Sequence, residues 1–382
     1  MRGLLNPDNR YGDDKAIEAC SLFGIMDTSG KLFSGEDITK AIANMHDRGN
    51  GLGGGFAAYG LYPNYSECYA LHIMFMGRKS KEAVEAFLRE HFDVAHIEEI
   101  PTQPSPGIAD PPALWRYFVV PRRGLNRGLS DDDYVVEKVM AINTTIADSF
   151  VFSSGKNMGV FKGVGYPEQI SRYFRLDEYK AYLWTAHGRF PTNTPGWWGG
   201  AHPFNILDWT VVHNGEISSY GINRRYLEMF GYQCTMQTDT EVVAYAVDLL
   251  VRRHRLPMEI VAAVMAPPLW SEIEIMGPDK RDLYTALRQT YGSLLLNGPF
   301  TIIIAHNGEM IGLTDRIRLR PLTAATRGKV LYLSSEEAAI RLICPEFDTV
   351  WKPRGGEPIV GRLDEPMARP SAGSVQNRRV AI

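Results

Sequence analysis

Cys20 opens the first apolar run of the chain, and its position constrains the fold more than any other feature. The small residue Ala19 precedes it, and Ser21–Met26 has the composition of a buried strand. Residues 1–19 are polar, carry charges and contain no hydrophobic stretch, so they do not form a secretory signal. We therefore expect residues 1–19 to be a leader or propeptide and the first strand to begin at the cysteine.

Four polar motifs in the second half of the chain carry side chains suited to catalysis. They would supply a guanidinium, an oxyanion pocket and a carboxylate to accompany the thiol of Cys20. These are the groups needed to hold a free amino acid by both α-charges and to attack its side-chain amide. In chain order the motifs are Arg189-Phe190-Pro191-Thr192-Asn193-Thr194-Pro195, Ala201-His202-Pro203-Phe204, His213-Asn214-Gly215-Glu216-Ile217 and Thr238-Asp239-Thr240-Glu241.

The wording and order of these motifs resemble the class II glutamine amidotransferases, and most of all the amidotransferase domain of glutamate synthase. Members of this family are N-terminal-nucleophile hydrolases, in which processing makes the catalytic cysteine the first residue. Residues 319–322 and 333–336 also resemble that domain, and we expect them to have structural roles. The chain departs from the family at Ser21, because similar enzymes have glycine after the cysteine.

The resemblance implies an α+β fold, a four-layer αββα sandwich, over residues 20–363. Many strands interspersed with helices fit two sheets packed face to face, but other layered arrangements fit the same pattern. Residues 101–131 are rich in proline and glycine around Trp115–Val119, so we interpret them as an excursion and a candidate partner surface. The tail, residues 364–382, has no periodic pattern, and we expect it to be mobile.

Apolar periodicity predicts the secondary structure along the domain. Ser34 is expected to cap a helix that ends at Met45, and Thr238 with Glu241 to form a capping box on a helix over 239–253. Other helices are expected over 80–91, 132–146, 223–230 and 336–342. Strands are expected over 21–26, 56–62, 69–75, 94–100, 149–152, 158–163, 183–189, 209–213, 300–305, 310–314, 330–334, 349–351 and 358–362.

Cys20 is the predicted nucleophile. A thiolate attacks rather than a thiol, and cleavage between Ala19 and Cys20 would free an α-amine with an ordinary pKa of about 7.7–8.0, which suits a general base near neutral pH. The alternative is a buried cysteine that acts only as a small apolar side chain. The four downstream motifs favour the nucleophile.

Arg48 is a second catalytic candidate, because Arg48-Gly49 resembles an Arg-Gly motif that the family places near its nucleophile. The alternative is a solvated arginine at a helix end. Glycines 51 and 53–55 follow a helix and precede a strand, the reverse of a dinucleotide-binding loop. We expect these glycines to let the backbone pass close to the reacting cysteine.

Arg189 and Asp239 are predicted to bind the two charged groups of an α-amino acid. Arg189 ends an apolar strand, and its planar fork suits a carboxylate, with further hydrogen bonds from Thr192 and Asn193. Asp239 would bind the ammonium, although the helix dipole also explains an aspartate at a helix start. His213, which precedes the oxyanion motif, joins the predicted substrate-binding residues.

Asn214 and Gly215 are the predicted oxyanion hole, with the amide and the backbone N–H directed at the tetrahedral oxygen. The alternative is an Asn-Gly hairpin turn. The same four residue types recur at 306–309 between two short apolar runs, where they predict a hairpin. The first copy leads towards a helix instead, and it alone matches the family position.

Composition excludes several classes of partner. The 382-residue chain has a net charge of -3, which gives no reason to expect nucleic acid or an anionic membrane surface. No apolar run approaches the roughly 20 residues of a membrane-spanning helix. The 4 cysteines lack C-x-x-C spacing, which argues against a metal or iron–sulfur site in this chain. Few cysteines and no signal indicate a cytoplasmic location.

The leading hypothesis is a glutaminase subunit that acts on L-glutamine within a hetero-oligomer. It would pass ammonia to the synthase partner subunits of a split glutamate synthase, with FMN and iron–sulfur clusters on those partner chains and no cofactor in this one. An amidotransferase for another acceptor, such as an N-methylglutamate-forming synthase, is an alternative. A non-catalytic regulatory subunit that keeps residues 1–19 is another.

Overall fold

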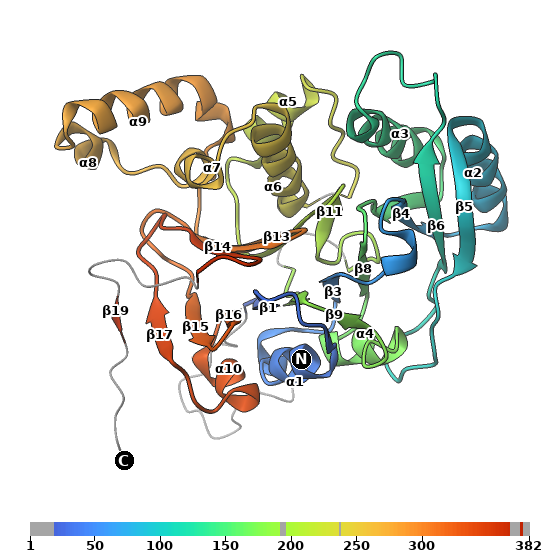
Figure 1. Ribbon diagram of the computed structural model, residues 1–382, viewed down its shortest axis with the longest axis horizontal. Coiled ribbons are helices and arrows are strands. Elements are labelled where there is room, and N and C mark those ends of the chain that lie inside the picture. Colours follow the sequence, from blue (N-terminus) through green and yellow to red (C-terminus); the bar gives the residue numbers. More distant parts are fainter. Residues whose placement is uncertain (1–18, 192–195, 237, 367–374, 377–382) are drawn as a thin grey trace, which may run out of the picture.

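Two antiparallel sheets stacked face to face form the centre of the protein. The computed structural model describes residues 19–191, 196–236, 238–366 and 375–376 (Figure 1). Across the larger sheet the strands are β19 (Val375–Gln376), β17 (Thr349–Lys352), β15 (Thr323–Arg327), β16 (Val330–Ser334), β1 (Ser21–Asp27), β10 (Leu183–Gly188), β3 (Gly54–Tyr59) and β8 (Met158–Gly163). Across the smaller sheet they are β11 (Phe204–Ile206), β12 (Trp209–Gly215), β13 (Phe300–His306), β14 (Glu309–Thr314) and β18 (Ile359–Arg362).

β1 lies in the middle of the larger sheet and is confirmed as the strand that follows the cysteine. All 7 of its residues are buried, because strands pair on both sides of it and both faces are covered. Phe23 pairs with Ala186 of β10 and with Ser334 of β16. A Cβ added to Gly24 would lie 2.8 Å from the sulfur of Met310, so the two sheets touch at this strand.

Helices cover the outer face of each sheet and complete four layers (Figure 1). The first helix packs inward through Ile38 and Ile42, which lie one turn apart on the same face. The predicted α+β fold, an αββα sandwich, is confirmed. On the larger sheet lie α1 (Glu36–Ala43), α4 (Pro167–Tyr173) and α10 (Glu337–Ile343), and on the smaller sheet α5 (Tyr220–Glu228) and α6 (Asp239–Val247).

A separate four-stranded sheet flanks the sandwich and corrects one prediction. Residues 101–131 are not an excursion throughout, because Ala113–Pro121 forms β6, an inner strand of this sheet. Tyr117 and Phe118 of β6 are buried, which explains the apolar run within this proline-rich segment. The strand order is β5 (Phe92–Glu99), β6, β4 (Tyr69–Phe75) and β7 (Ser149–Ser153), and α2 (Arg78–His91) and α3 (Asp131–Thr145) pack against the sheet.

The predicted capping box at the start of α6 is wrong. Thr238 occupies the N-cap position, but its side chain makes no capping hydrogen bond. The carboxylate of Glu241 instead accepts hydrogen bonds from the backbone N–H groups of Thr235 and Met236, at 3.0 and 2.9 Å. The loop before α6 folds back over the first turn of the helix. Its N–H groups bind the Glu241 carboxylate, which therefore does not accept from the backbone of Thr238 as it would in a capping box.

Three other boundaries differ from the predictions. The helix expected over 239–253 changes to a π-helical stretch at Asp248–Arg253. The first helix begins after Ser34, with Gly35 at its N-cap position. The tail over 364–382, expected to be mobile, contributes β19, which pairs with β17 at the edge of the larger sheet.

Several elements have no clear signal in the sequence. The longest of them, α9, buries only Leu287 among its 14 residues, so it lacks an apolar stripe. Within the described ranges, no helix combines the length and the hydropathy needed to cross a lipid bilayer. The unpredicted elements include β2 (Phe33–Ser34), β9 (Lys180–Ala181), α7 (Met258–Met265), α8 (Trp270–Glu274) and α9 (Pro278–Tyr291).

Candidate active site

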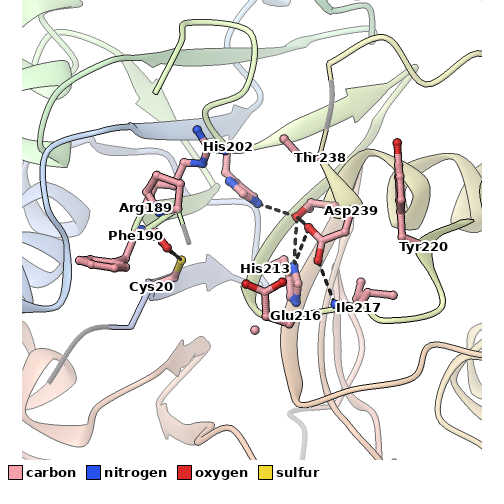
Figure 2. Close-up of a pocket in the computed structure, with 13 residues that line it drawn as sticks. Cys20, Arg189, Phe190, His202, His213, Glu216, Ile217, Tyr220, Thr238 and Asp239 are labelled. Carbon is pink, nitrogen blue, oxygen red and sulfur yellow. Dashed lines mark hydrogen bonds and ion pairs between the residues drawn. The ribbon is translucent and has the colours of Figure 1, made fainter. Parts of the chain in front are cut away.

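Cys20 lies directly before β1, at the wall of a cavity of about 250 Å³ (Figure 2). Pockets for drug-sized ligands usually measure roughly 300–1,000 Å³, so this cavity suits a small metabolite. The stacking of the two sheets brings its walls together from the start of β1, the ends of β10 and β12, and the start of α6. Its lining residues are Cys20, Arg189, Phe190, Pro191, His202, His213, Gly215, Glu216, Ile217, Tyr220, Thr238, Asp239 and Thr240.

The backbone of Phe190 brackets the sulfur of Cys20. The N–H of Phe190 donates to Sγ at 3.3 Å, and the carbonyl oxygen of Phe190 lies 3.8 Å from Sγ. Burial raises the pKa of the Cys20 thiol, against the lowering effects of the Phe190 N–H and of Arg189 and Arg320. The pocket therefore holds the sulfur as a thiol, and nucleophilic attack requires a base.

Arg48 lies behind Cys20 and does not line the cavity. Its Nε donates to the carbonyl oxygen of Cys20 at 3.2 Å, and its Nη1 pairs with Glu336 at 2.7 Å. The side chain is only 18% exposed, so the alternative of a solvated arginine does not hold. These contacts orient the backbone of the cysteine, and the catalytic role that we predicted for Arg48 stays a prediction.

Arg189 follows β10 and is buried in the cavity wall, with 3% of its surface exposed. Its N–H donates to the carbonyl oxygen of Gly53 at 2.9 Å. A Cβ added to Gly53 would lie 2.9 Å from Cδ of Arg189, so this glycine makes room for the arginine and not, as we predicted, for the cysteine. The predicted companions Thr192 and Asn193 lie outside the described residues.

Asp239 opens α6 on the opposite side of the cavity from Arg189 (Figure 2). Its Oδ2 accepts a hydrogen bond from the N–H of Ile217 at 2.9 Å, and its Oδ1 lies 3.7 Å from Nδ1 of His213. Burial would raise the pKa of Asp239, but His213, the Ile217 N–H and the Thr240 hydroxyl outweigh it and hold the pKa below its usual range. The carboxylate is therefore ionised at neutral pH, as an ammonium-binding group requires.

Asn214 and Gly215 end β12. Val212, two residues earlier, belongs to the core between the sheets, so the side chain of Asn214 faces the same space. That side chain is buried, and within the described part of the chain its Nδ2 has no hydrogen-bond partner. Gly215 has a φ of 146°, and a Cβ there would lie 1.9 Å from the carbonyl oxygen of Pro299. Gly215 lines the cavity and Asn214 directly precedes it, and their role as an oxyanion hole stays a prediction.

Three buried histidines lie at the cavity: His202 and His213 line it and His187 lies behind them, and of these only His213 was predicted. Nε2 of His187 lies 2.8 Å from the carbonyl oxygen of His213, and the ring of His187 stacks on that of His202 at 3.9 Å. Burial lowers the pKa of His187 to about 3 and holds the pKa of His202 well below its usual range, so both rings are neutral at pH 7. His202 stood within one of the quoted motifs, which was the available signal for it.

Lys162 and Glu241 are two further buried titratable groups near these histidines, and neither was predicted as a site residue. Nζ of Lys162 donates to the carbonyl oxygen of Gly199 at 2.9 Å. Burial lowers the pKa of Lys162 to about 7 and raises the pKa of Glu241 to about 7. No group of three or more His, Cys, Asp or Glu residues in the described ranges is arranged to hold a metal ion.

The chain belongs to the class II glutamine amidotransferases. The model of the family described as "Glutamine amidotransferases class-II" matches residues 78–352, which is most of the chain. The predicted family is therefore confirmed, and this part of the chain is a class II glutamine amidotransferase domain. Cys20 and Arg48 precede the matched range.

Similar proteins include close and distant relatives. An uncharacterized protein of Archaeoglobus fulgidus is 62% identical over 354 residues, which are 92% of this chain and 94% of that protein. Amidophosphoribosyltransferase of Methanocaldococcus jannaschii is 26% identical over 222 residues, 56% of this chain and 41% of that protein. The glutamate synthase (NADPH) large chain of Bacillus subtilis is 29% identical over 237 residues, 55% of this chain and 15% of that protein. The chain spans less than half of each of the two named enzymes.

Proposed function

We propose that this chain hydrolyses L-glutamine to glutamate and ammonia. The observation that carries the proposal is the cavity, which combines the thiol of Cys20, the buried guanidinium of Arg189 and the ionised carboxylate of Asp239. A free amino acid presents an α-carboxylate to the guanidinium and an α-ammonium to the carboxylate. Its side-chain amide then extends towards the sulfur.

The reaction proceeds through a thioester. The thiol of Cys20 gives its proton to a base as its sulfur forms a bond to the amide carbon of glutamine. The carbonyl oxygen of the amide becomes an oxyanion, which accepts hydrogen bonds from the Asn214 amide and the Gly215 N–H. The oxyanion collapses, the C–N bond breaks, and the nitrogen leaves as ammonia after taking a proton from the base. Water then attacks the thioester carbon, which releases glutamate and returns the proton to the sulfur.

The base is the α-amine of Cys20, freed when the leader is removed. The raised pKa of the thiol supports this assignment, because the pocket by itself does not stabilise a thiolate. An α-amine has an ordinary pKa of about 7.7–8.0 and titrates close to working pH. In the uncleaved chain this nitrogen is an amide and cannot accept a proton.

The ammonia goes to a partner. We propose the synthase subunits of a split glutamate synthase, and the similarity to the glutamate synthase large chain supports this choice. The flavin and iron–sulfur cofactors of such an enzyme would lie on the partner chains, within a cytoplasmic hetero-oligomer. The similarity to amidophosphoribosyltransferase supports the alternative of a different acceptor, and an N-methylglutamate-forming synthase is one such acceptor enzyme.

Intact mass, measured before and after treatment with a glutamine-analogue electrophile, tests the proposed chemistry. Active protein should lack residues 1–19 and should gain one adduct, located on Cys20 by peptide mapping. Full glutaminase activity from a chain that still carries Met1 would contradict the assignment of the base. An inert, unprocessed chain would support the regulatory alternative.

A further measurement tests the division of labour between the chains. The isolated chain should be colourless and should release glutamate from glutamine slowly. A stoichiometric flavin on the purified chain would contradict the placement of the cofactors on partner subunits.

A further inference from the structure

The hydroxyl of Thr240 is the centre of a buried polar group in the cavity wall, named here the histidine cluster: Thr240, His187, His202 and His213. The oxygen of Thr240 lies 2.7 Å from Nε2 of His202, 3.0 Å from Nδ1 of His213 and 3.3 Å from Oδ1 of Asp239. Thr240 is fully buried. A hydroxyl has one proton to donate and two lone pairs to accept with, so these three neighbours use its whole capacity.

Only one arrangement of protons makes all three contacts hydrogen bonds. Asp239 is ionised and can only accept, so the hydroxyl proton of Thr240 points to Oδ1. Both ring nitrogens must then donate to the hydroxyl oxygen, which places a proton on Nε2 of His202 and on Nδ1 of His213. If the hydroxyl donated to either ring, its oxygen would face the carboxylate oxygen with no hydrogen between them.

The remaining atoms of the histidine cluster agree with this arrangement. Nε2 of His187 faces the carbonyl oxygen of His213, which can only accept, so His187 carries its proton on Nε2. The buried ring atoms that lack a partner within the described residues are Nδ1 of His187, Nδ1 of His202 and Nε2 of His213. Each of these three is the bare nitrogen in the arrangement, so no ring N–H is buried without an acceptor.

We propose that Thr240 is a positioning residue for the carboxylate of Asp239, and so for the seat of the substrate ammonium. The hydroxyl proton anchors Oδ1, while the N–H of Ile217 anchors Oδ2 at 2.9 Å (Figure 2). The ring N–H groups of His202 and His213 donate to the hydroxyl oxygen and hold the hydroxyl in the orientation that this requires. The effect on glutamine rests on the proposed function, whereas the proton arrangement is independent of it.

Nitrogen NMR of protein labelled with ¹⁵N-histidine tests the proton arrangement without an activity assay. The chain has 9 histidines, and single His→Gln variants assign their signals. We expect a proton on Nδ1 of His213, and a proton on Nε2 alone in His187 and His202. A bare Nδ1 on His213, or a bare Nε2 on His202, at pH 7 would overturn the proposal.

Two substitutions test the positioning itself. Thr240→Val keeps the shape of the side chain and removes the hydroxyl, whereas Thr240→Ser keeps the hydroxyl. Thr240→Val should raise the KM for glutamine about 10- to 100-fold, the effect of one lost hydrogen bond to a charged group. The kcat should change less, because the ammonium is held equally in ground and transition states. Thr240→Ser should restore the KM to within about threefold of the natural protein.

Thr185→Val is the matched control, because the hydroxyl of Thr185 is also buried but has no partner within the described residues. The positioning role would be overturned if the KM for glutamine were the same in all three variants, Thr240→Val, Thr240→Ser and Thr185→Val. A protein that never releases ammonia from glutamine would refute the proposed function, while the NMR pattern would still decide the proton arrangement. If Thr240→Val does not fold, the NMR pattern of the natural protein decides alone.

Discussion

The two copies of His-Asn-Gly-Glu have the same residues and different surroundings. The first copy, 213–216, lies at the carboxyl end of β12, and the second, 306–309, joins β13 to β14. Because β12 and β13 are antiparallel neighbours, the carboxyl end of one strand lies beside the amino end of the other, and the two copies lie on opposite sides of the smaller sheet along the strand direction. Only the first copy reaches the cavity that contains Cys20.

The asparagine amides show the consequence. Nδ2 of Asn307 donates to the carbonyl oxygen of Lys156 at 2.9 Å and to Oδ2 of Asp208 at 2.7 Å, so it anchors a hairpin turn. Nδ2 of Asn214 is buried and has no partner in the described part of the chain. The two amides thus have different environments, although they stand in the same four-residue motif. A repeated motif therefore does not imply a repeated function.

Loss of the predicted nucleophile, Cys20, should have the largest effect. It tests whether all activity comes from the cavity that the first copy reaches. Cys20→Ser should lower glutaminase kcat about 10⁴-fold or more, because a hydroxyl is a weak nucleophile without a strong base. Cys68→Ser is the matched control: Cys68 is a free cysteine that precedes Tyr69, which bridges to Lys156 near the second copy. Comparable losses in both variants would break the assignment.

The next largest difference should lie between substitutions of the two motif glycines, Gly215 and Gly308, and it concerns the free energy of unfolding. Gly215→Ala would place a Cβ 1.9 Å from the carbonyl oxygen of Pro299, so we expect a loss of about 3–5 kcal/mol or failure to fold. Gly308 also has a positive φ, 83°, but a Cβ there would meet only Leu363, at 3.5 Å. Gly308→Ala should therefore cost about 1–2 kcal/mol. Urea unfolding monitored by circular dichroism measures both values, and a costlier Gly308→Ala would reverse the comparison.

The two asparagines should separate activity from stability. Asn214→Ala should lower kcat about 10²–10³-fold, because it removes one donor to the oxyanion. Asn307→Ala should leave kcat nearly unchanged and reduce the free energy of unfolding by about 1–3 kcal/mol, because the carboxylate of Asp208 loses a hydrogen bond.

Glutaminase kcat must be measured on protein shown by mass and circular dichroism to be processed and folded. A larger loss of kcat at Asn307 than at Asn214 would mean that the active site belongs to the second copy.

The smallest effect concerns the free energy of unfolding at acid pH, to which the buried His187 contributes. The pKa of His187 is about 3 in the folded protein, against about 6.5 in the unfolded chain. The folded state binds the proton less readily, so the contribution of His187 to stability is lost as pH falls from 6.5 towards 3. At pH 5 the contribution lost amounts to about 2 kcal/mol.

Urea unfolding of His187→Gln and of the natural protein at pH 5 and pH 7 measures this loss. Between pH 7 and pH 5, the free energy of unfolding of the variant should fall by about 2 kcal/mol less than that of the natural protein. Between pH 7 and pH 8 the changes in the two proteins should differ by only about 0.1 kcal/mol, because the His187 ring is already mostly neutral in both states. An equal acid dependence in both proteins would show that His187 is not buried in its neutral form.

Short patterns predicted the strands near the cavity well and the outer elements poorly. β1 and β10, which border the cavity, were predicted to within one residue of their observed ends, and β4 and β8 were predicted with their observed ends, because all four are mostly apolar and are buried throughout. The hairpin of β13 and β14 followed from its Asn-Gly turn. By contrast, β6 lies in a segment whose prolines suggested an excursion, and α9 shows no apolar stripe. The burial of these elements depends on neighbours that the local sequence does not show.

The sequence by itself determined the family, the candidate nucleophile and the order of the motifs that surround it, because these are properties of residue type and spacing. The tertiary structure decided which copy of His-Asn-Gly-Glu reaches the cavity, that Arg48 contacts the cysteine backbone, and that Thr240 joins Asp239 to buried histidines. Periodicity depends on residues a few positions apart, whereas Phe190 meets Cys20 across 170 residues. Contacts of that range arise only when β1 and β10 pair within the larger sheet.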